Sequence, residues 1–459
     1  MIFPDSRHEK ACQYICQTAR NAGGRAFLVG GCVRDWLLGL PPKDLDVEIY
    51  GLEPAKIEQF LRAKFRVEMV GKSFGVWILK GYNIDVSSPR RERKTGGGHK
   101  AFDVECDPFM SPQDACSRRD FTINSMLFDY LTGEIIDPYG GRSDMRLKIL
   151  RHTSERFRED PLRVLRAMQF SARFEMEVAP ETVQICRTIE PENLPQERIY
   201  EEWKKLVLRG VKISLGLNFL RDCGWIKYFP ELAATAGCKQ DPQWHPEGDV
   251  FTHTGFCMDS FAKDRIGDEW EDIVVGFAVL CHDFGKPRCT KICEDGKIRS
   301  YGHDILGVAP TRSFLQRLTR EKALIEQVLP LVERHMAILD LWKSNAGDSA
   351  IRRLARKVGR IDRLVRIDKA DRNGRPPEIP GESPQGERIM ARAETLKVKD
   401  SAPKPIIMGR HLIELGLKPS PDFGKITNAA YEAQLDGKFD DLQGGLAFVN
   451  KMLEIRQQL

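Results

Sequence analysis

The stretch FLVGGCVRDWLLGLPPKDLDVEIYG (residues 27–51) decides the predicted fold of the N-terminal part of this chain. It begins with an apolar, strand-like run, breaks at Gly30-Gly31, and continues with the spacing of a helix over about 32–40 before a second strand-like run. A glycine pair between a strand and a helix opens backbone N–H groups toward the helix N-terminus, where anions bind favourably. The stretch therefore predicts a strand–turn–helix–strand unit with an anion site at its turn.

The second strand-like run, DLDVEIY, carries alternating carboxylates. Because successive side chains of a strand point to opposite faces, Asp44, Asp46 and Glu48 should share one face. Such carboxylates repel one another without a cation, and their oxygens are the ligands that Mg²⁺ prefers. A solvated edge strand is the simpler alternative, but it does not explain the glycine turn. The pattern favours Asp44 and Asp46 as metal ligands; Asp85, in YNIDVSS, is either a third carboxylate or a turn cap.

The composition is that of a globular protein of two to four domains, with 459 residues, 41% hydrophobic, 30% charged and a net charge of +5. The longest apolar run, at 273–281, is about half the length that a membrane-spanning helix needs. The N-terminus lacks the basic-then-apolar pattern of a signal peptide. Twelve cysteines without a CxxC pair indicate a reducing environment. We therefore expect a cytoplasmic protein with no membrane partner.

The pattern of elements changes along the chain and predicts an α+β fold. Residues 1–140 mix short β-like runs with helices, which indicates a head with a small mixed β-sheet. All-helical parts should follow: an Arg-rich neck at 141–235, a histidine-bearing domain at 236–380, and a linker with a helical tail at 381–459.

Three ordered motifs carry a resemblance to a known family. The first is GG-x-x-RD-x-x-LG-x-x-x-KD-x-D, formed by Gly30, Gly31, Arg34, Asp35, Leu38, Gly39, Lys43, Asp44 and Asp46. It resembles the nucleotidyltransferase head, of polymerase β-like fold, in bacterial tRNA nucleotidyltransferases and poly(A) polymerases. RRDFTINSM (118–126) and EDPLRVLRAMQFSARF (159–174) resemble that family's second and nucleotide-selecting motifs. With WHPEGDVFTHT, LCHDFGK and DKADRNGR, the chain resembles a bacterial CCA-adding enzyme with an HD phosphohydrolase domain.

The resemblance implies template-independent addition of CCA, from CTP and ATP, to the 3′ end of tRNA. Two Mg²⁺ ions would be held by Asp44 and Asp46 for in-line attack on the α-phosphate. The implied nucleotide-binding residues are Gly30, Gly31, Arg34, Arg119, Asp120, Asn124, Asp160, Arg163 and Arg166. Asp160 and Arg163, three apart on a predicted helix, would share a face and read the amino and ring-nitrogen edges of cytosine and adenine.

Two features leave the product open. Gln169 stands where close relatives commonly have a third arginine of R-x-x-R-x-x-R. The glycine loop RRERKTGGGHKAF (90–102) looks like the segment with which the family switches from C to A addition. One alternative is therefore an A-adding enzyme or poly(A) polymerase with an HD domain. A second is chiefly an HD metal phosphohydrolase whose head only binds a regulatory nucleotide.

Five of the nine histidines fall between residues 245 and 335. By resemblance to HD phosphohydrolases, the metal ligands are His253, His282, Asp283 and Asp371. Imidazole with carboxylate suits a divalent transition metal such as Mn²⁺, Ni²⁺ or Co²⁺. His303 and His335 could hold a second metal or the substrate phosphate. The implied substrates are 2′,3′-cyclic phosphates, 2′-nucleotides or phosphomonoesters.

The run IRRLARKVGRIDRLVRIDKADRNGR (351–375) concentrates positive charge, with ten Lys/Arg against three Asp. Such a run is usually the solvated face of a helix. Beside motifs that need an RNA 3′ end, it predicts a phosphate-binding face that contributes salt-dependent affinity. We expect the acceptor arm of tRNA, CTP and ATP as partners, and a monomer or homodimer.

Overall fold

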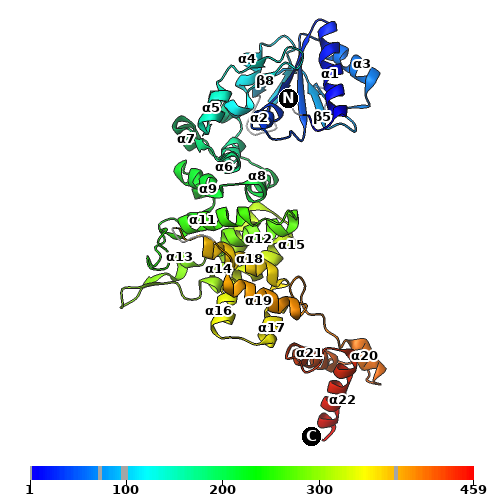
Figure 1. The fold of residues 1–459 in the computed structure, drawn as a ribbon, viewed down its shortest axis with the longest axis vertical. Helices are drawn as coiled ribbons and strands as arrows, with labels where there is room; N and C mark the ends of the chain where they lie inside the picture. Colours follow the sequence, from blue (N-terminus) through cyan, green and yellow to red (C-terminus); the bar gives the residue numbers. More distant parts are fainter. Residues whose placement is uncertain (1–2, 71–74, 95–101, 377–380, 459) are drawn as a thin grey trace. The chain divides into compact units, whose positions relative to one another are not determined.

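The fold is described from a computed structural model, over residues 3–70, 75–94, 102–376 and 381–458 (Figure 1). The chain forms two compact units. The first unit comprises Met1–Leu206 and Leu215–Trp225, and the second comprises Val207–Ser214 and Ile226–Leu459. The predicted division into four domains stays a prediction.

A seven-stranded mixed sheet in the order β3-β4-β5-β2-β1-β8-β9 forms the first unit's N-terminal part. The strands are β1 (Arg25–Val29), β2 (Leu45–Tyr50), β3 (Val67–Val70), β4 (Val76–Leu79), β5 (Ile84–Ser87), β8 (Leu127–Phe128) and β9 (Ile135–Ile136). β2 pairs in parallel with β5, and the other neighbours are antiparallel. A separate ribbon pairs β6 (Arg90–Lys94) with β7 (Phe102–Cys106). The predicted head with a small mixed sheet is confirmed.

Helices flank this sheet: α1 (Ser6–Asn21), α2 (Gly31–Leu37), α3 (Pro54–Lys64) and α4 (Pro112–Ser117), with a 3-10 turn η1 (Thr122–Asn124). The Asp5 side chain caps α1 by accepting from two backbone N–H groups. The helix predicted over 32–40 ends earlier, at Leu37. Gly39, at φ 74°, takes the left-handed conformation that terminates helices.

Helices follow the sheet, as predicted. They are α5 (Gly141–Leu147), α6 (Leu162–Phe174), α7 (Pro180–Arg187), α8 (Gln196–Arg209), α9 (Ile213–Asp222) and α10 (Pro230–Ala233), with a 3-10 turn η2 (Glu155–Glu159) and a parallel pair of β10 (Ile149–Leu150) and β11 (Glu177–Val178). In α6 the apolar residues Val164, Leu165 and Met168 are buried, so this helix is fixed by the core along one side.

The second unit is helical, with one short hairpin of β12 (Lys291–Ile292) and β13 (Ile298–Arg299). Its helices are α11 (Val250–Lys263), α12 (Glu269–Cys281), α13 (Lys286–Cys289), α14 (His303–Leu318), α15 (Lys322–Glu333), α16 (Ala337–Lys343), α17 (Asp348–Val358), α18 (Ile361–Asn373), α19 (Pro384–Thr395), α20 (Gly409–Glu414), α21 (Asp422–Leu435) and α22 (Leu442–Gln458). α12 is buried along most of its length, and α11, α15 and α18 pack around it. This packing fixes the residue that follows α12, His282, at the end of a rigid helix. Helices α20–α22 share an apolar cluster of their own.

The twelve cysteines are free thiols, so packing rather than cross-linking holds these cores together. Among the helices that the structure describes, none combines the length and the apolar character needed to cross a membrane.

Candidate functional site

Three aspartates lie near one another on the head sheet. The parallel register of β2 and β5 places Asp46 opposite Asp85, and Asp44 directly precedes β2. Asp46 keeps access to solvent, but the protein atoms around its carboxylate desolvate it and raise its pKa to about 6. The attraction of Arg119 lowers this pKa, while repulsion from Asp85, Asp44 and Glu48 raises it further. Burial and Asp44 also raise the pKa of Asp85. Carboxylates that disfavour one another's charge are short of positive charge, so this group fits a divalent cation.

Glu48 is on the same strand but is buried, at 2% exposure. Its Oε2 accepts a hydrogen bond from the Tyr50 hydroxyl at 2.6 Å, and its Oε1 accepts from Arg118 Nη2 at 3.2 Å. Arg119 Nη2 lies 3.7 Å from Glu48 Oε2. Glu48 is therefore neutralised by two arginines, and it holds them beside Asp46 rather than extending the row of metal ligands.

Gly30 is needed where the chain passes from β1 into α2. Its φ is 71°, and a Cβ at this position would lie 2.8 Å from Arg119 Nη1 and 3.8 Å from Asp46 Oδ2. The Gly30 N–H donates to the Met126 carbonyl at 3.4 Å. The glycine thus provides room for the arginine next to the carboxylates, while the predicted anion contact of Gly30 and Gly31 stays a prediction.

A surface hollow of about 350 Å³ connects these groups. Its lining residues are Val29, Asp46, Glu48, Val76, Asp85, Ser87, Ser88, Arg90, Arg118, Arg119 and Arg163. Four guanidinium groups face two unneutralised carboxylates in one hollow. This arrangement suits a polyphosphate that arrives with divalent cations, because arginine binds phosphate oxygens and carboxylate binds the metal.

A buried hydrogen-bond network joins α2, the second motif and α6. Arg166 Nε donates to Asp120 Oδ2 at 2.8 Å, and Asn124 Nδ2 donates to Asp120 Oδ1 at 2.8 Å. Arg34 Nη1 donates to Asn124 Oδ1 at 2.6 Å, and Arg34 Nε donates to Asp35 Oδ1 at 2.8 Å. Burial alone would raise the pKa of Asp120, but the charge of Arg166 and the hydrogen bonds outweigh it and lower the pKa. The structure brings these predicted nucleotide-binding residues together as a frame in which they bind one another.

The prediction that Asp160 and Arg163 share a helix face is wrong, because α6 begins at Leu162. Asp160 has extended backbone angles, and its Oδ1 accepts from the Leu162 N–H at 3.1 Å while its Oδ2 accepts from Arg198 Nη2 at 2.8 Å. Arg163 Nη2 donates to the Arg118 carbonyl at 2.6 Å. Asp160 therefore lies just before the helix and accepts from its first N–H, and Arg163 ties the helix to the second motif. An aspartate followed by proline is a sequence signal for such a start.

Gln169 lies on α6 with 2% exposure, and its Oε1 has no hydrogen-bond partner among the described residues. The predicted glycine loop at 90–102 is flanked by the β6–β7 pair. Its central part, 95–101, lies outside the described residues.

Four histidines of the second unit share one feature: the Nδ1 atom of each ring faces an acceptor oxygen. In each, Nδ1 lies close to an acceptor oxygen: His253 at 2.7 Å from Glu247 Oε1, His282 at 2.7 Å from the Val279 carbonyl, His303 at 2.7 Å from the Ser300 carbonyl, and His335 at 2.8 Å from the Val332 carbonyl. An acceptor beside Nδ1 selects the tautomer with its proton there, so each neutral ring presents a lone pair at Nε2.

The Nε2 atoms of His253 and His282 face carboxylates. Burial lowers the pKa of His253, but contacts with Cys257, Asp371 and Glu247 outweigh it and raise the pKa well above its usual value, so a proton lies between this Nε2 and Asp371 when no metal is bound. His253 Nε2 lies 3.1 Å from Asp371 Oδ1, and His282 Nε2 lies 3.2 Å from Asp283 Oδ2. His282 Nε2 has no hydrogen-bond partner within the described part of the chain, whereas Asp283 Oδ2 has an ion-pair partner, Lys286 Nζ, at 2.7 Å. Acceptors at these separations repel unless a cation or a proton lies between them.

A second group of acceptors lies beside the first. His303 Nε2 is 3.1 Å from His335 Nε2, and 3.4 Å from Asp283 Oδ1. Burial, with repulsion from His282 and His303, lowers the pKa of His335 to about 4, so its ring stays neutral near pH 7. The residues present fit a divalent transition metal, which binds neutral imidazole and carboxylate together.

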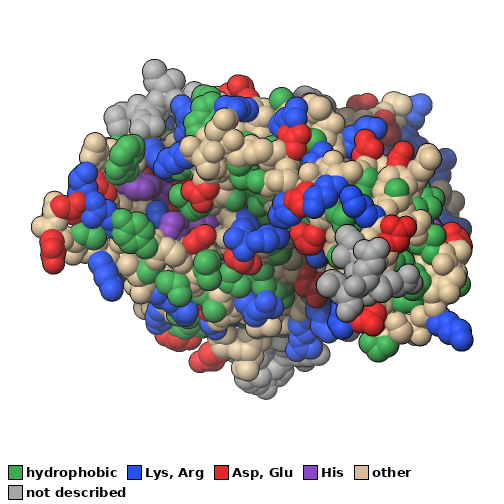
Figure 2. Space-filling view, turned by 90° about the horizontal axis from the view of Figure 1, so that it is seen from below, with side chains coloured by type: hydrophobic (Ala, Val, Ile, Leu, Met, Phe, Trp, Pro, Cys, Tyr) green, Lys and Arg blue, Asp and Glu red, His purple; other side chains and the backbone are tan. Residues whose placement is uncertain are grey.

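The structure brings together all four predicted HD ligands. Ligand atoms of His253, His282 and Asp371 lie within 4.8 Å of one another, and those of Asp283, His303 and His335 form a similar group. Asp283, Asp371, His303 and His335 line a hollow of about 210 Å³, together with Lys286 and Arg375. Figure 2 shows histidine side chains gathered in a hollow, with Lys/Arg and hydrophobic side chains around them.

Sequence reasoning missed two residues of this site. Glu247, whose Oε1 lies 2.9 Å from His245 Nδ1 as well as against His253, fixes the orientation of both rings. Cys257 belongs to the same ligand cluster as His253. Its signal in the sequence is the spacing of four residues, which places both side chains on one face of a helix.

The predicted phosphate-binding face of residues 351–375 is not favoured by the structure. Seven of its ten cations form ion pairs with carboxylates: Arg353, Arg356, Arg360, Arg363, Arg366, Lys369 and Arg375. Glu271 and Asp272, at the start of α12, accept from Arg363 and Arg366. The run therefore serves mainly to pack α17 and α18 against their neighbours.

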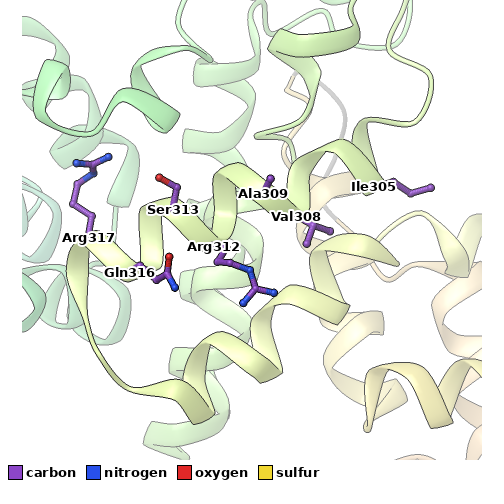
Figure 3. Close-up of a pocket in the computed structure, with 7 residues that line it drawn as sticks. All are labelled: Ile305, Val308, Ala309, Arg312, Ser313, Gln316 and Arg317. Atoms are coloured by element: carbon purple, nitrogen blue, oxygen red, sulfur yellow. The ribbon is translucent and has the colours of Figure 1, made fainter.

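Another hollow, of about 600 Å³, runs along the outside of α14 (Figure 3). All seven lining residues come from this one helix: Ile305, Val308, Ala309, Arg312, Ser313, Gln316 and Arg317. The Ser313 hydroxyl donates to Glu231 Oε1, and Arg317 Nη2 donates to the same oxygen at 3.1 Å, so this carboxylate is already paired and we assign the hollow no chemistry.

The chain is similar to known proteins along most of its length. The family profile of the Poly A polymerase head domain matches residues 26–151. The chain is 33% identical over 391 residues to the multifunctional CCA protein of Laribacter hongkongensis, which covers 82% of this chain and 93% of that protein. It is 34% identical over 363 residues to the multifunctional CCA protein of Acinetobacter baumannii; this alignment covers 76% of this chain and 84% of that protein.

Solved structures share the fold. The Bacillus stearothermophilus CCA-adding enzyme in complex with CTP matches with a TM-score of 0.68 and 23% identity, over 99% of both chains. The Thermotoga maritima CCA-adding enzyme complexed with tRNA_CCA matches with a TM-score of 0.60 and 18% identity, over 98% of this chain and 96% of that one. Since the identity with the curated relatives exceeds 30% over more than two thirds of the chain, the protein belongs to the family of the multifunctional CCA proteins.

Proposed function

We propose that this protein adds CCA to the 3′ end of tRNA, using CTP and ATP. The observation that carries the proposal is the hollow in which Asp46 and Asp85 face Arg118 and Arg119. The relatives named for CCA, and the solved CCA-adding enzymes with CTP and with tRNA, support the choice of substrates. The acceptor arm of the tRNA would be the part recognised, because duplex RNA is read mainly by shape.

The reaction would join the RNA 3′-oxygen to the α-phosphate of the nucleotide, and pyrophosphate would leave. Mg²⁺ held by Asp44 and Asp46, with Asp85 beside them, would supply Lewis-acid chemistry that lowers the hydroxyl pKa and neutralises the leaving group. Arg118 and Arg119 would bind the triphosphate oxygens, since Glu48 already orients both guanidinium groups beside the carboxylates.

Nucleotide selection would use the frame built on α6. Asp120, Asn124 and Arg166 would hold the wall of the pocket rigid through their mutual hydrogen bonds. Asp160 and Arg163 stay the proposed base-reading pair. Both have protein partners in this structure, so a bound base would have to replace the contacts with Arg198 and the Arg118 carbonyl.

The test uses tRNA transcripts that end at the discriminator base, at C or at CC, each with CTP or ATP alone. We expect C to be added to the first two transcripts and A to the third. Failure to add C to the shortest transcript would favour terminal-A or poly(A) addition instead. Asp46→Asn should abolish incorporation with every transcript, since the variant loses a metal-ligand charge; incorporation that survives would overturn the assignment of Asp46.

We infer a second activity, metal-dependent phosphoester hydrolysis, for the histidine site. The unpartnered Nε2 of His282 among acceptor groups supports it, because it indicates a cation site. A divalent transition metal held by His253, His282, Asp283 and Asp371 would supply a Lewis acid for the hydrolysis of 2′,3′-cyclic phosphates, 2′-nucleotides or phosphomonoesters. Lys286 and Arg375 line the same hollow and would attract the phosphate.

The two activities should separate in variants. His282→Ala should abolish release of phosphate from 2′,3′-cyclic AMP, and also hydrolysis of 2′-AMP, while CCA addition continues at the normal rate. Asp46→Asn should do the reverse. If either folded variant lost both activities, the assignment of two independent sites would be wrong. If the unmodified protein hydrolyses phosphoesters but incorporates no nucleotide, the result would favour the alternative of a phosphohydrolase whose head only binds a regulatory nucleotide.

A further inference from the structure

Cys257 lies inside the ligand cluster of the histidine site. It follows His253 by four residues on α11, so both side chains project from one face of the helix. Its Sγ lies 3.3 Å from His253 Nε2 and 3.8 Å from His253 Nδ1, and the residue is fully buried. A thiol at this place touches the atoms that would bind a metal.

The four groups have the spacing of one coordination sphere. The ligand atoms of His253, Cys257, His282 and Asp371 all lie within 4.8 Å of one another. Around a tetrahedral zinc ion, ligand atoms lie about 3.3–3.7 Å apart, given the usual metal–nitrogen and metal–sulfur bond lengths. The separations of 3.1 Å from His253 Nε2 to Asp371 Oδ1 and of 3.3 Å to Cys257 Sγ are close to this range.

His282 gives an independent indication of a bound cation. Its Nδ1 proton is directed to the Val279 carbonyl, so its Nε2 is an acceptor. That Nε2 has no hydrogen-bond partner among the described residues, the residue is 1% exposed, and the atom belongs to the cluster with Cys257. A buried acceptor directed at other acceptors is stable only if a positive charge lies between them.

The backbone after Asp371 holds the thiol in place. A Cβ at Gly374 would lie 2.3 Å from Cys257 Sγ, so only glycine allows this approach. The Gly374 carbonyl lies 3.2 Å from His253 Nδ1, and the Asp371 carbonyl lies 3.9 Å from Cys257 Sγ. The same turn therefore positions three of the four groups.

We propose that Cys257 is a ligand, as thiolate, of the metal ion held by His253, His282 and Asp371. Binding would replace the thiol proton: Cys–SH and M²⁺ give Cys–S–M⁺ and H⁺, with no change of oxidation state. A sulfur ligand favours thiophilic cations such as Zn²⁺ or Co²⁺ over Mg²⁺ or Mn²⁺. The inference rests on the metal site of the proposed hydrolase and adds to it the identity of one ligand and the class of metal.

The test titrates the chelator-stripped, full-length protein with Co²⁺ and records its absorption spectrum. We expect a near-ultraviolet thiolate-to-cobalt charge-transfer band that saturates with bound metal. In Cys257→Ser cobalt should still bind, as measured by elemental analysis, but the band should be lost. Cys281→Ala is the matched control, because Cys281 is equally buried in the same unit and should leave the band unchanged.

Metal competition gives a second readout. Cys257→Ser should weaken Zn²⁺ binding by at least about tenfold, the smaller end of what even outer-shell substitutions cost, and should change Mn²⁺ binding less. Equal losses for the two metals would contradict a sulfur ligand.

The possible failures are distinguishable. Cobalt bound to the unmodified protein without the band, or a band that survives Cys257→Ser, would overturn the sulfur ligand and leave the metal site standing. Binding of no cobalt at all would overturn the metal site and this inference together. The spectrum of the unmodified protein decides the matter even if the variant does not fold.

Discussion

Gly30 shows how a single residue sets the geometry of the head site. Its φ of 71° is costly for any residue with a Cβ, and the Cβ would press on Arg119, which lies beside Asp46. Gly133, in the turn between β8 and β9, also has a positive φ, of 75°, but nothing lies within 4 Å of a Cβ there. Alanine substitutions at the two glycines therefore separate the cost of a positive φ from the effect of displacing the Arg119 side chain.

At this scale we predict that Gly30→Ala lowers nucleotide incorporation by about a hundredfold, the lower end of the cost of losing one charge-stabilising donor. Gly133→Ala should leave incorporation unchanged. Both variants should lose about 1–3 kcal/mol of stability, because each forces an alanine to a positive φ. Incorporation rates and calorimetric unfolding measure the two effects; equal incorporation by the two variants would refute the role of the Arg119 contact.

At the scale of elements, ion pairs attach α18 to α12. Arg363 donates from Nε and Nη2 to the two carboxylate oxygens of Glu271, at 2.6 and 2.7 Å, and both side chains are buried. On α17, Arg353 pairs with Asp436, the residue that follows α21, at 2.6 Å, but its side chain is 39% exposed. The first pair lies in a region of low dielectric and the second is screened by water.

We predict that Arg363→Met costs about 3 kcal/mol of stability, because it leaves Glu271 buried with less compensation. Arg353→Ala should cost less than about 1 kcal/mol. Neither change should reduce tRNA affinity at 0.1 M salt (an assay condition), since these charges are already paired within the protein. Calorimetry and filter binding test this; a weaker, less salt-dependent complex of Arg353→Ala would restore the phosphate-binding face.

At the scale of the whole molecule, each compact unit carries its own site. The head carboxylates belong to the first unit and the histidine cluster to the second. A ligand stabilises the region that it binds, by about 2.7 kcal/mol at a hundredfold excess over its dissociation constant. The two sites should therefore respond to different ligands in different parts of the chain.

We predict that CTP with Mg²⁺ slows hydrogen exchange in β1, β2 and β5, and that Co²⁺ slows it in α11, α12 and α18. Exchange limited by opening of the liganded region should slow by up to about a hundredfold under these conditions. His282→Ala should remove the cobalt effect and retain that of CTP. Protection by cobalt confined to the head would contradict the assignment of the histidine site.

Several features follow from the sequence alone because they depend on residues close together in the chain. Strand alternation places Asp44 and Asp46 together, the glycine pair marks the turn into α2, and His282 with Asp283 ends the apolar helix α12. Sequence pattern was sufficient to predict the head and the helical part that follows it, while the HD ligand set stays a prediction made from the family resemblance.

The rest depended on contacts between residues far apart in the sequence. Asp85 could be placed beside Asp46 only by the parallel pairing of β2 with β5. Glu271 pairs with Arg363, 92 residues later, and this contact could not be read from the basic run itself. Asp160 lies outside α6, where its Oδ2 accepts from Arg198 Nη2, 38 residues later in the chain.

The sequence by itself determined which chemical groups this protein carries and in which local elements they lie, because helical and strand periodicity act over a few residues. Only the tertiary structure decided which groups meet: Glu48 beneath two arginines, and Asp371 against a histidine 118 residues earlier. Cys257 became a candidate ligand in the same way, since the packing of α11 against α18 brings its thiol to the site. Burial and charge pairing depend on the packed interior, and no local pattern records them.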